Sequence, residues 1–132
     1  MFYLGKECLH CLTHLRDINK KQEDWERLDT VVLAVSSNQP EANAASLQTI
    51  AAPVARILSD RNFENARHFQ SYDDFEEMEI HSTILIDKNG RVHWARSGGE
   101  PFSDMSFLVK QIERMNKSVE PKQTDAPTAA GR

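Results

Sequence analysis

Cys8 and Cys11 are the only two cysteines in the sequence, and they enclose Leu9 and His10 in a Cys-x-x-Cys motif. Apolar residues recur at helical spacing from Cys8 onward, so we expect this cysteine near the N-terminus of a helix that follows a very short strand. Unpaired N–H groups and the helix dipole at that end favour the thiolate, which is the attacking species in thiol chemistry. Cys11 lies one turn further on the same face, from which it could close a reversible disulfide with Cys8.

Several charged or titratable residues could tune this pair. A protonated His10 would stabilise a thiolate and make the cysteine pair more oxidising. Lys6 adds a positive charge, which Glu7 partly opposes. Further along the chain, His81 lies at the start of the strand predicted at 82–86, immediately before its first residue, where it is either a charge or hydrogen-bond partner for the cysteines or a partly exposed strand-end histidine. The remaining histidines are expected at the surface: His14, His68 and His93.

Three interpretations without redox catalysis are open at this point. The two cysteines could be plain core residues of a helix. A metal could be held by Cys8, Cys11 and His14, although no fourth ligand is evident and structural zinc usually has four. The domain could also be a degenerate redox fold kept for interactions, which unreactive cysteines would support. Haem attachment is excluded, because it requires a histidine directly after the second cysteine and Leu12 is there instead.

The composition is that of one ordinary globular domain. The chain has 132 residues, of which 39% are hydrophobic and 27% charged, and its net charge is −4. An acidic balance without a basic block gives nucleic-acid binding no electrostatic support. No apolar run approaches the roughly 20 residues of a membrane helix, and the N-terminus lacks the pattern of a signal peptide. We therefore expect a cytoplasmic protein without membrane association, in which a close cysteine pair is more often catalytic or metal-binding than structural.

The rest of the chain alternates strands and helices. Apolar runs and turn signals predict strands at residues 2–4, 31–35, 54–58, 82–86 and 91–96. Helical periodicity predicts a helix from residue 8 that ends before 28, and further helices at 41–50, 62–69 and 103–116. Ser59 and Asp60 are expected to cap the helix at 62–69. The run at 31–35 is typical of a strand buried on both faces, and residues 71–79 are expected to form an acidic loop.

This order predicts an α/β domain over residues 1–116, with a mixed central sheet flanked by helices, and a disordered tail over 117–132. The cysteine pair then lies at the carboxyl end of the first strand, where such folds place their sites.

Three segments resemble the peroxiredoxin-like branch of the thioredoxin superfamily, the alkyl hydroperoxide reductase and thiol-specific antioxidant group. Residues 2–11, FYLGKECLHC, are similar to the family's strand-loop-helix F-Y-P-x-x-x-T-x-x-C. Residues 57–60, ILSD, are similar to its L-L-S-D, and residues 81–92, HSTILIDKNGRV, are similar to its R-S-T-F-L-I-D-x-x-G-x-V. The resemblance covers about residues 2–115 and implies a thioredoxin-like fold and a thiol-dependent activity.

The resemblance implies two alternative registers for the cysteines. In the peroxiredoxin register, Cys11 falls on the peroxidatic cysteine and Cys8 on the threonine that would hydrogen-bond it. Leu4 then falls on the family's proline and His81 on its arginine, so three of the four signature positions differ. In the thioredoxin register, Cys8 is the exposed nucleophile and Cys11 its resolving partner, and Ser82 takes the place of the cis-proline.

The sequence therefore predicts a thiol-dependent oxidoreductase that performs thiol-disulfide exchange or peroxide reduction. Its expected site residues are Cys8 as nucleophile, Cys11 as resolving or peroxidatic cysteine, His10 as thiolate tuner and His81 as support. No bound cofactor is expected; the substrate would be a peroxide or a protein disulfide, and electrons would come from a dithiol protein such as a thioredoxin. Since the first strand has barely four residues, we expect a thioredoxin-like domain truncated at its N-terminus.

Overall fold

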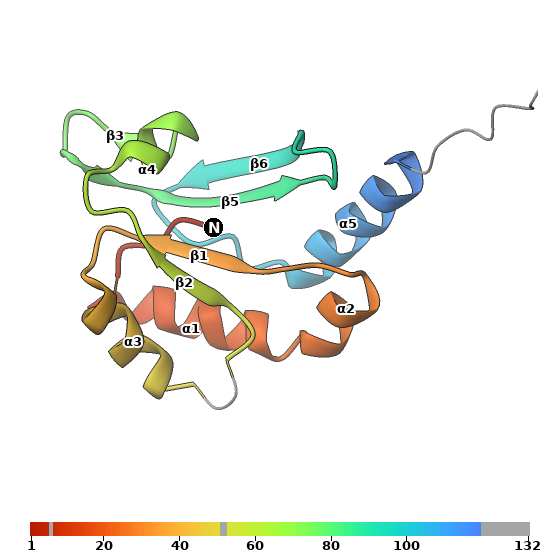
Figure 1. Ribbon diagram of the computed structural model, residues 1–132, viewed down its shortest axis with the longest axis horizontal. Coiled ribbons are helices and arrows are strands. Elements are labelled where there is room, and N and C mark those ends of the chain that lie inside the picture. The colour runs from red at the N-terminus through yellow and green to blue at the C-terminus, as the bar shows by residue number, and fades with distance from the viewer. Residues whose placement is uncertain (6, 51–52, 120–132) are drawn as a thin grey trace, which may run out of the picture.

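The computed structural model describes residues 1–5, 7–50 and 53–119 (Figure 1). Its helices are α1 (Leu9–Asn19), α2 (Gln22–Arg27), α3 (Pro40–Gln48), α4 (Glu64–His68) and α5 (Met105–Val119). Its strands are β1 (Leu33–Ser36), β2 (Arg56–Ser59), β3 (Tyr72–Asp73), β4 (Met78–Glu79), β5 (His81–Ile86) and β6 (Val92–Gly98).

The central sheet consists of two strand pairs joined through one residue. β1 pairs with β2 in parallel, and β5 pairs with β6 in antiparallel orientation. Phe2 lies between the two pairs and forms a parallel bridge to Val35 of β1 and an antiparallel bridge to Ser82 of β5. Its backbone exchanges two hydrogen bonds with Ser82, at 2.8 and 3.2 Å, and the N–H of Tyr3 donates to the Val35 carbonyl at 3.0 Å. The predicted mixed sheet is confirmed, but the strand expected at 2–4 is reduced to this bridge.

Helices pack against the sheet around two apolar clusters. The first cluster joins α1, α2 and α5 through the buried residues Ile18, Trp25, Leu28, Met105, Leu108, Ile112 and Met115. The second lies where α1 meets β1 and contains Tyr3, Cys11, Leu15, Ala34, Ile50 and Ala55. Burial of one large apolar side chain contributes about 1.5–3 kcal/mol, so these clusters hold α1, with the cysteine motif at its start, firmly on β1.

The helix expected between residues 8 and 28 is in fact two helices. α1 ends at Asn19 and α2 begins at Gln22. The indole N–H of Trp25 donates to the carbonyl of Ile18 at 2.8 Å, which also accepts the N–H of Lys21 at 3.0 Å, and so ties α2 to the end of α1. The apolar periodicity continues across this break, which is why the sequence pattern alone does not reveal it.

The expectation that residues 31–35 are buried on both faces is wrong. Val31 is 69% exposed and Leu33 is 42% exposed, whereas Ala34 is fully buried. Beyond Phe2, no strand among the described residues pairs with the facing edges of β1 and β5, and a cavity of about 560 Å³ opens between them. The apolar run predicted the strand correctly, but it did not reveal which of its faces is covered.

Between β2 and β5, the structure confirms that Asp60 caps α4 and corrects the loop expected at residues 71–79. The Asp60 carboxylate accepts hydrogen bonds from the backbone N–H groups of Asn65 and Ala66, at 3.1 and 2.8 Å, and caps α4 as expected. Burial opposes ionisation of Asp60, but these donors outweigh it and hold the pKa of the carboxyl below its usual value. The Ser59 hydroxyl, expected to share this cap, instead accepts from the Asn43 amide at 3.0 Å. Residues 71–79 are not simply a loop, since β3 and β4 pair there in antiparallel orientation.

The C-terminal helix extends past the expected domain boundary. α5 continues to Val119, so residues 117–119 are helical rather than part of a tail, and the remainder of the expected tail, 120–132, lies outside the described residues. Phe107 is half-buried, packs against the first apolar cluster, and contacts the rings of Trp94 and Phe102 at centroid distances of 5.3 and 5.6 Å. No helix within residues 1–5, 7–50 and 53–119 is long and apolar enough to cross a membrane.

Candidate active site

The loop that leads into α1 depends on a close approach between two segments. Gly5 has a φ of 95°, a left-handed conformation that glycine adopts without strain. A Cβ at this position would fall on the side-chain amide of Asn38, in the loop between β1 and α3. The Gly5 carbonyl accepts a hydrogen bond from the N–H of Cys8 at 3.2 Å. Gly5 therefore fixes the direction in which the chain enters the cysteine motif.

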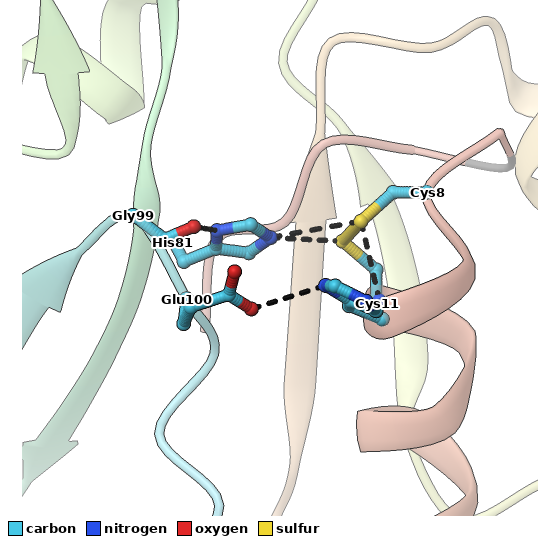
Figure 2. The surroundings of a disulfide bond; sticks show 6 residues. Cys8, Cys11, His81, Gly99 and Glu100 are labelled. Atoms are coloured by element: carbon cyan, nitrogen blue, oxygen red, sulfur yellow. Dashed lines mark hydrogen bonds and ion pairs between the residues drawn. A yellow bond between two sulfur atoms is a disulfide. The ribbon is translucent and has the colours of Figure 1, made fainter.

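Cys8 and Cys11 are joined by a disulfide at the first turn of α1 (Figure 2). Their Cα atoms are 5.2 Å apart, within the ordinary range for a disulfide of about 4.4–6.8 Å. Cys8 is the N-cap residue, and its Sγ accepts a hydrogen bond from the backbone N–H of Cys11 at 3.2 Å. Cys11 has no exposed surface, whereas Cys8 is half-buried. Of the two cysteines, Cys8 is therefore the one that a second molecule can reach.

His81 lies against both sulfur atoms (Figure 2). Its Nε2 is 3.0 Å from Sγ of Cys11 and 3.7 Å from Sγ of Cys8, and its Nδ1 is 3.0 Å from the carbonyl oxygen of Gly99. A carbonyl oxygen only accepts hydrogen bonds, so Nδ1 carries a proton. In the neutral imidazole, Nε2 then presents its lone pair to the sulfurs.

The bridge at Phe2 explains why residues 70 positions apart in the sequence meet here. His81 is the first residue of β5 and pairs with Gly98 of β6. Its neighbour Ser82 is hydrogen-bonded to Phe2, and the chain passes from Phe2 through a short loop to Cys8. The side chain of His81 is 6% exposed, so the interpretation of this residue as a partly exposed strand-end histidine is wrong.

His10 does not join this cluster. Its Nδ1 lies 3.0 Å from a carboxylate oxygen of Glu100, and the side chains of both residues are more than 70% exposed. Adjacent helical positions point about 100° apart, so a residue next to Cys11 in sequence faces away from it. Lys6, the other expected source of positive charge, lies outside the described residues.

Sequence reasoning missed Gly99 and Glu100. Gly99 acts through its backbone carbonyl, which carries no sequence signal, and Glu100 becomes relevant only because the loop after β6 brings it to α1. A Gly-Gly pair before a charged residue was the only local feature that could have pointed to this loop.

His14 is a core residue rather than a surface residue. It is 5% exposed, and neither ring nitrogen forms a hydrogen bond of ordinary geometry with another described residue. Burial lowers its pKa from 6.5 to about 4, and a weak polar interaction with the Phe102 backbone does not offset this. The expected surface positions of His68 and His93 are confirmed.

The metal-ligand set suggested by the sequence changes accordingly. Cys8, Cys11 and His81 place their potential ligand atoms within 4.8 Å of one another. His14 does not belong to this group. The two cysteines remain in this group, but the histidine that accompanies them comes from β5 and not from α1.

A buried polar cluster anchors the same end of the sheet. The Tyr3 hydroxyl and the Ser36 hydroxyl both donate to Oδ1 of Asn43, at 3.2 and 2.7 Å, and the Asn43 amide donates to the Ser59 hydroxyl at 3.0 Å. Burial raises the pKa of Tyr3, which keeps the phenol neutral. These bonds tie β1, β2 and α3 to the segment that precedes the cysteines.

Comparison with known proteins identifies the relatives of this arrangement. The sequence model of the AhpC/TSA family matches residues 1–95. The structure of AhpC from Enterococcus faecalis superposes with a TM-score of 0.80 at 20% identity, covering 96% of this chain and 79% of that chain. The reduced 2-Cys peroxiredoxin of Plasmodium vivax gives 0.75 at 14% identity, covering 89% and 75%.

A third similar structure is the bacterioferritin comigratory protein of Xanthomonas campestris, described in connection with alkyl peroxide reduction. It superposes with a TM-score of 0.72 at 17% identity, covering 86% of this chain and 75% of that chain. None of the curated proteins matches the sequence significantly. The structural matches confirm the predicted thioredoxin-like fold.

Proposed function

Because this chain belongs to the AhpC/TSA family, we propose that it is a thiol-dependent peroxide reductase that attacks its substrate through Cys8. The family match supports a hydroperoxide as the substrate class. The observation that carries the choice of Cys8 is the unequal burial of the two bonded cysteines, since Cys11 has no exposed surface and Cys8 is half-buried. This assignment follows the thioredoxin register of the motif on a peroxiredoxin fold.

The surroundings of Cys8 favour a thiolate in the reduced protein. Its sulfur accepts the backbone N–H of Cys11 and lies at the N-terminus of α1, where free N–H groups and the helix dipole favour negative charge. The lone pair on Nε2 of His81, 3.7 Å from this sulfur, is placed to receive the thiol proton. His10 contributes only at longer range, and its pairing with Glu100 reduces its effect.

In the first step, the Cys8 thiolate attacks the O–O bond of a hydroperoxide. A sulfur–oxygen bond forms, the O–O bond breaks, and the leaving alkoxide takes a proton from the His81 imidazolium to give an alcohol. Cys8 is oxidised to the sulfenic acid and the peroxide is reduced by two electrons.

In the second step, Cys11 resolves this intermediate. Its thiol gives a proton to Nε2 of His81, 3.0 Å away, and the thiolate attacks the Cys8 sulfur. The sulfur–oxygen bond breaks, and the leaving hydroxide takes the proton from His81 to form water. The product is the Cys8–Cys11 disulfide, which a dithiol protein such as a thioredoxin would reduce to complete the cycle.

A second candidate function is thiol-disulfide exchange. It is favoured by the Cys-x-x-Cys disulfide itself, because a motif that closes a small ring at a helix N-terminus is the arrangement that exchange requires. Cys8 would then attack a sulfur of a substrate disulfide, and Cys11 would release the substrate from the mixed disulfide. Both candidates use the same attacking residue.

A single-turnover experiment tests the proposal and separates the two candidates. The reduced wild type, Cys8→Ser and Cys11→Ser are mixed with hydrogen peroxide, with an alkyl hydroperoxide, or with a disulfide peptide, and the products are identified by mass spectrometry. We expect Cys11→Ser to accumulate a Cys8 sulfenic acid that a dimedone probe traps, and Cys8→Ser to react slowly with every oxidant.

Two results would contradict this. If Cys8→Ser formed a Cys11 sulfenic acid at the wild-type rate, the attacking residue would be Cys11. If the wild type reacted rapidly with the disulfide peptide and slowly with both peroxides, the protein would be a disulfide oxidoreductase.

A further inference from the structure

The three side chains at the redox site also make up a set of metal ligands. Sγ of Cys8, Sγ of Cys11 and Nε2 of His81 lie within 4.8 Å of one another. Two thiolates and one imidazole suit a borderline-soft divalent ion such as zinc, whereas calcium and magnesium prefer oxygen ligands.

The orientation of His81 is that of a metal-binding histidine. A ligating imidazole usually donates its second N–H to a carbonyl or carboxylate, which fixes the tautomer. Here Nδ1 donates to the carbonyl of Gly99 at 3.0 Å, so the lone pair of Nε2 is directed at the two sulfurs. Figure 2 shows the ring held between Gly99 on one side and the sulfur atoms on the other.

The distances around Nε2 lie on either side of the value for tetrahedral coordination. Zn–S bonds of about 2.3 Å and Zn–N bonds of about 2.0 Å place a nitrogen and a sulfur ligand about 3.5 Å apart. The observed distances from Nε2 are 3.0 Å to Cys11 and 3.7 Å to Cys8. Reduction breaks the sulfur–sulfur bond, and the half-buried Cys8 at the end of α1 has room to separate from the fully buried Cys11.

From these observations we propose that the reduced protein binds one zinc ion through Cys8, Cys11 and His81, and that the zinc-bound dithiolate and the disulfide are alternative states of the site. The exposed side of Cys8 leaves the fourth position to water. The proposal rests on the proposed function only in requiring that the two cysteines alternate between dithiol and disulfide.

Zinc binding and oxidation would then exclude each other, because both use the electron pairs of the two thiolates. When a hydroperoxide oxidises the zinc-bound dithiolate, the two thiolates lose two electrons and form the disulfide. The hydroperoxide takes up these electrons and two protons, giving an alcohol and water. The disulfide sulfurs no longer carry negative charge, so the zinc ion leaves. One zinc ion is released for each disulfide formed.

Metal titration of the reduced protein tests this without any measurement of turnover. Cobalt(II) is added anaerobically to the reductant-free dithiol form as a spectroscopic probe and is then displaced with zinc, whose affinity is measured against a chromophoric chelator. We expect one equivalent to bind, with thiolate-to-cobalt charge-transfer bands and the visible bands of a tetrahedral site. The disulfide form should bind none.

Variants identify the nitrogen ligand. We expect His81→Ala to weaken zinc binding at least about tenfold, and the exposed His93→Ala, a matched control on β6, to leave it unchanged. His81→Gln serves as a second variant, and circular dichroism establishes that each variant is folded. The proposal is overturned if the reduced wild type binds no zinc, if the disulfide form binds it equally well, or if folded His81 variants bind it like the wild type.

The same samples separate this proposal from the proposed function. Peroxide-driven disulfide formation is measured on metal-free protein. If that reaction fails while zinc still binds through His81, the proposed function is wrong and the zinc site stands. If the reaction proceeds and zinc does not bind, the zinc site is wrong and the proposed function stands.

Discussion

His81 and His14 are almost equally buried, at 6% and 5% exposure, but the surroundings of their ring nitrogens differ, polar around His81 and apolar around His14. Around His81, each ring nitrogen faces a polar partner, the carbonyl of Gly99 on one side and two sulfurs on the other. Around His14, apolar side chains from α1, β5 and α5 line a cavity of about 90 Å³, and neither ring nitrogen has a hydrogen-bond partner among the described residues.

This difference shows that burial by itself does not make a histidine a functional residue. A buried polar group without a partner costs about 1–3 kcal/mol, so His14 lowers the stability of the fold. The same burial around His81 shields its contacts with the two cysteine sulfurs from solvent. Mutation of His81 should therefore change the rate of disulfide formation, whereas mutation of His14 should change the free energy of unfolding.

The largest effect is expected at Cys8, whose sulfur lies beside His81 and is partly exposed to solvent. Cys8→Ser should lower peroxide-dependent turnover at least about 10³-fold, because it removes the attacking group, and should change the free energy of unfolding of the reduced protein little. Turnover is followed with a coupled dithiol reductant, and unfolding by urea titration. Retention of more than a tenth of the activity would show that Cys8 is not the attacking residue.

His81→Ala comes next and tests the comparison directly. If His81 is the proton acceptor, its loss should slow disulfide formation about 10²-fold or more. His14→Leu should leave the rate within about twofold at pH 7. Stopped-flow tryptophan fluorescence measures both variants. Equal slowing of the two would show that His81 and His14 do not differ in their effect on the rate.

The pH dependence of stability should identify His14. Its pKa is about 4 in the folded protein, against an ordinary value of 6.5, so the unfolded chain binds more protons between these values. Stability is therefore complete above pH 6.5 and falls as the pH drops toward 4, by at most about 3 kcal/mol. Urea unfolding of the wild type at pH 7, 5.5 and 4 measures the slope.

His14→Leu provides the control for this slope. It should be about 1 kcal/mol more stable than the wild type at pH 7 because it removes an unpartnered polar group, and its stability should fall less between pH 6.5 and 4. Identical slopes in the two proteins would assign the acid sensitivity to other groups.

The smallest effect is expected at a third histidine, His10, which has an ion-pair partner but is exposed to solvent. Glu100→Gln breaks the exposed pair with His10 and should change the free energy of unfolding by less than about 1 kcal/mol. Thermal unfolding at low and high salt measures this change. A larger loss would show that a partner alone, without burial, is enough to make a histidine contribute.

The sequence predicted the positions of most elements because their signals are local. Continuous apolar runs indicated β1 and β5, and the Cys-x-x-Cys motif marked the start of α1. The burial of His14 could also have been predicted, since it lies three residues after Cys11 and four before Ile18, on the face that packs inward. A polar side chain favours the surface in general, but the position of His14 on this helix face decides its burial.

Other features had no local signal. The contact between His81 and the cysteines depends on which strands flank Phe2, and this is decided by tertiary pairing. The partner of its Nδ1 is a backbone carbonyl, which any residue could supply. The covered and uncovered faces of β1 depend likewise on what packs against them. Sequence spacing therefore indicated the two cysteines, but the position of His81 beside them and its tautomer required the fold.

The bridge at Phe2 has a mechanical consequence. Cys11 moves with the β1–β2 pair, because it packs in the cluster that contains Ala34 of β1, whereas His81 belongs to the β5–β6 pair. Among the described residues, Phe2 is the joint between these two bodies. A slip at this joint would lengthen the 3.0 Å separation of Nε2 and the Cys11 sulfur almost directly. The alignment of the two halves of the sheet therefore sets the separation between His81 and the cysteines.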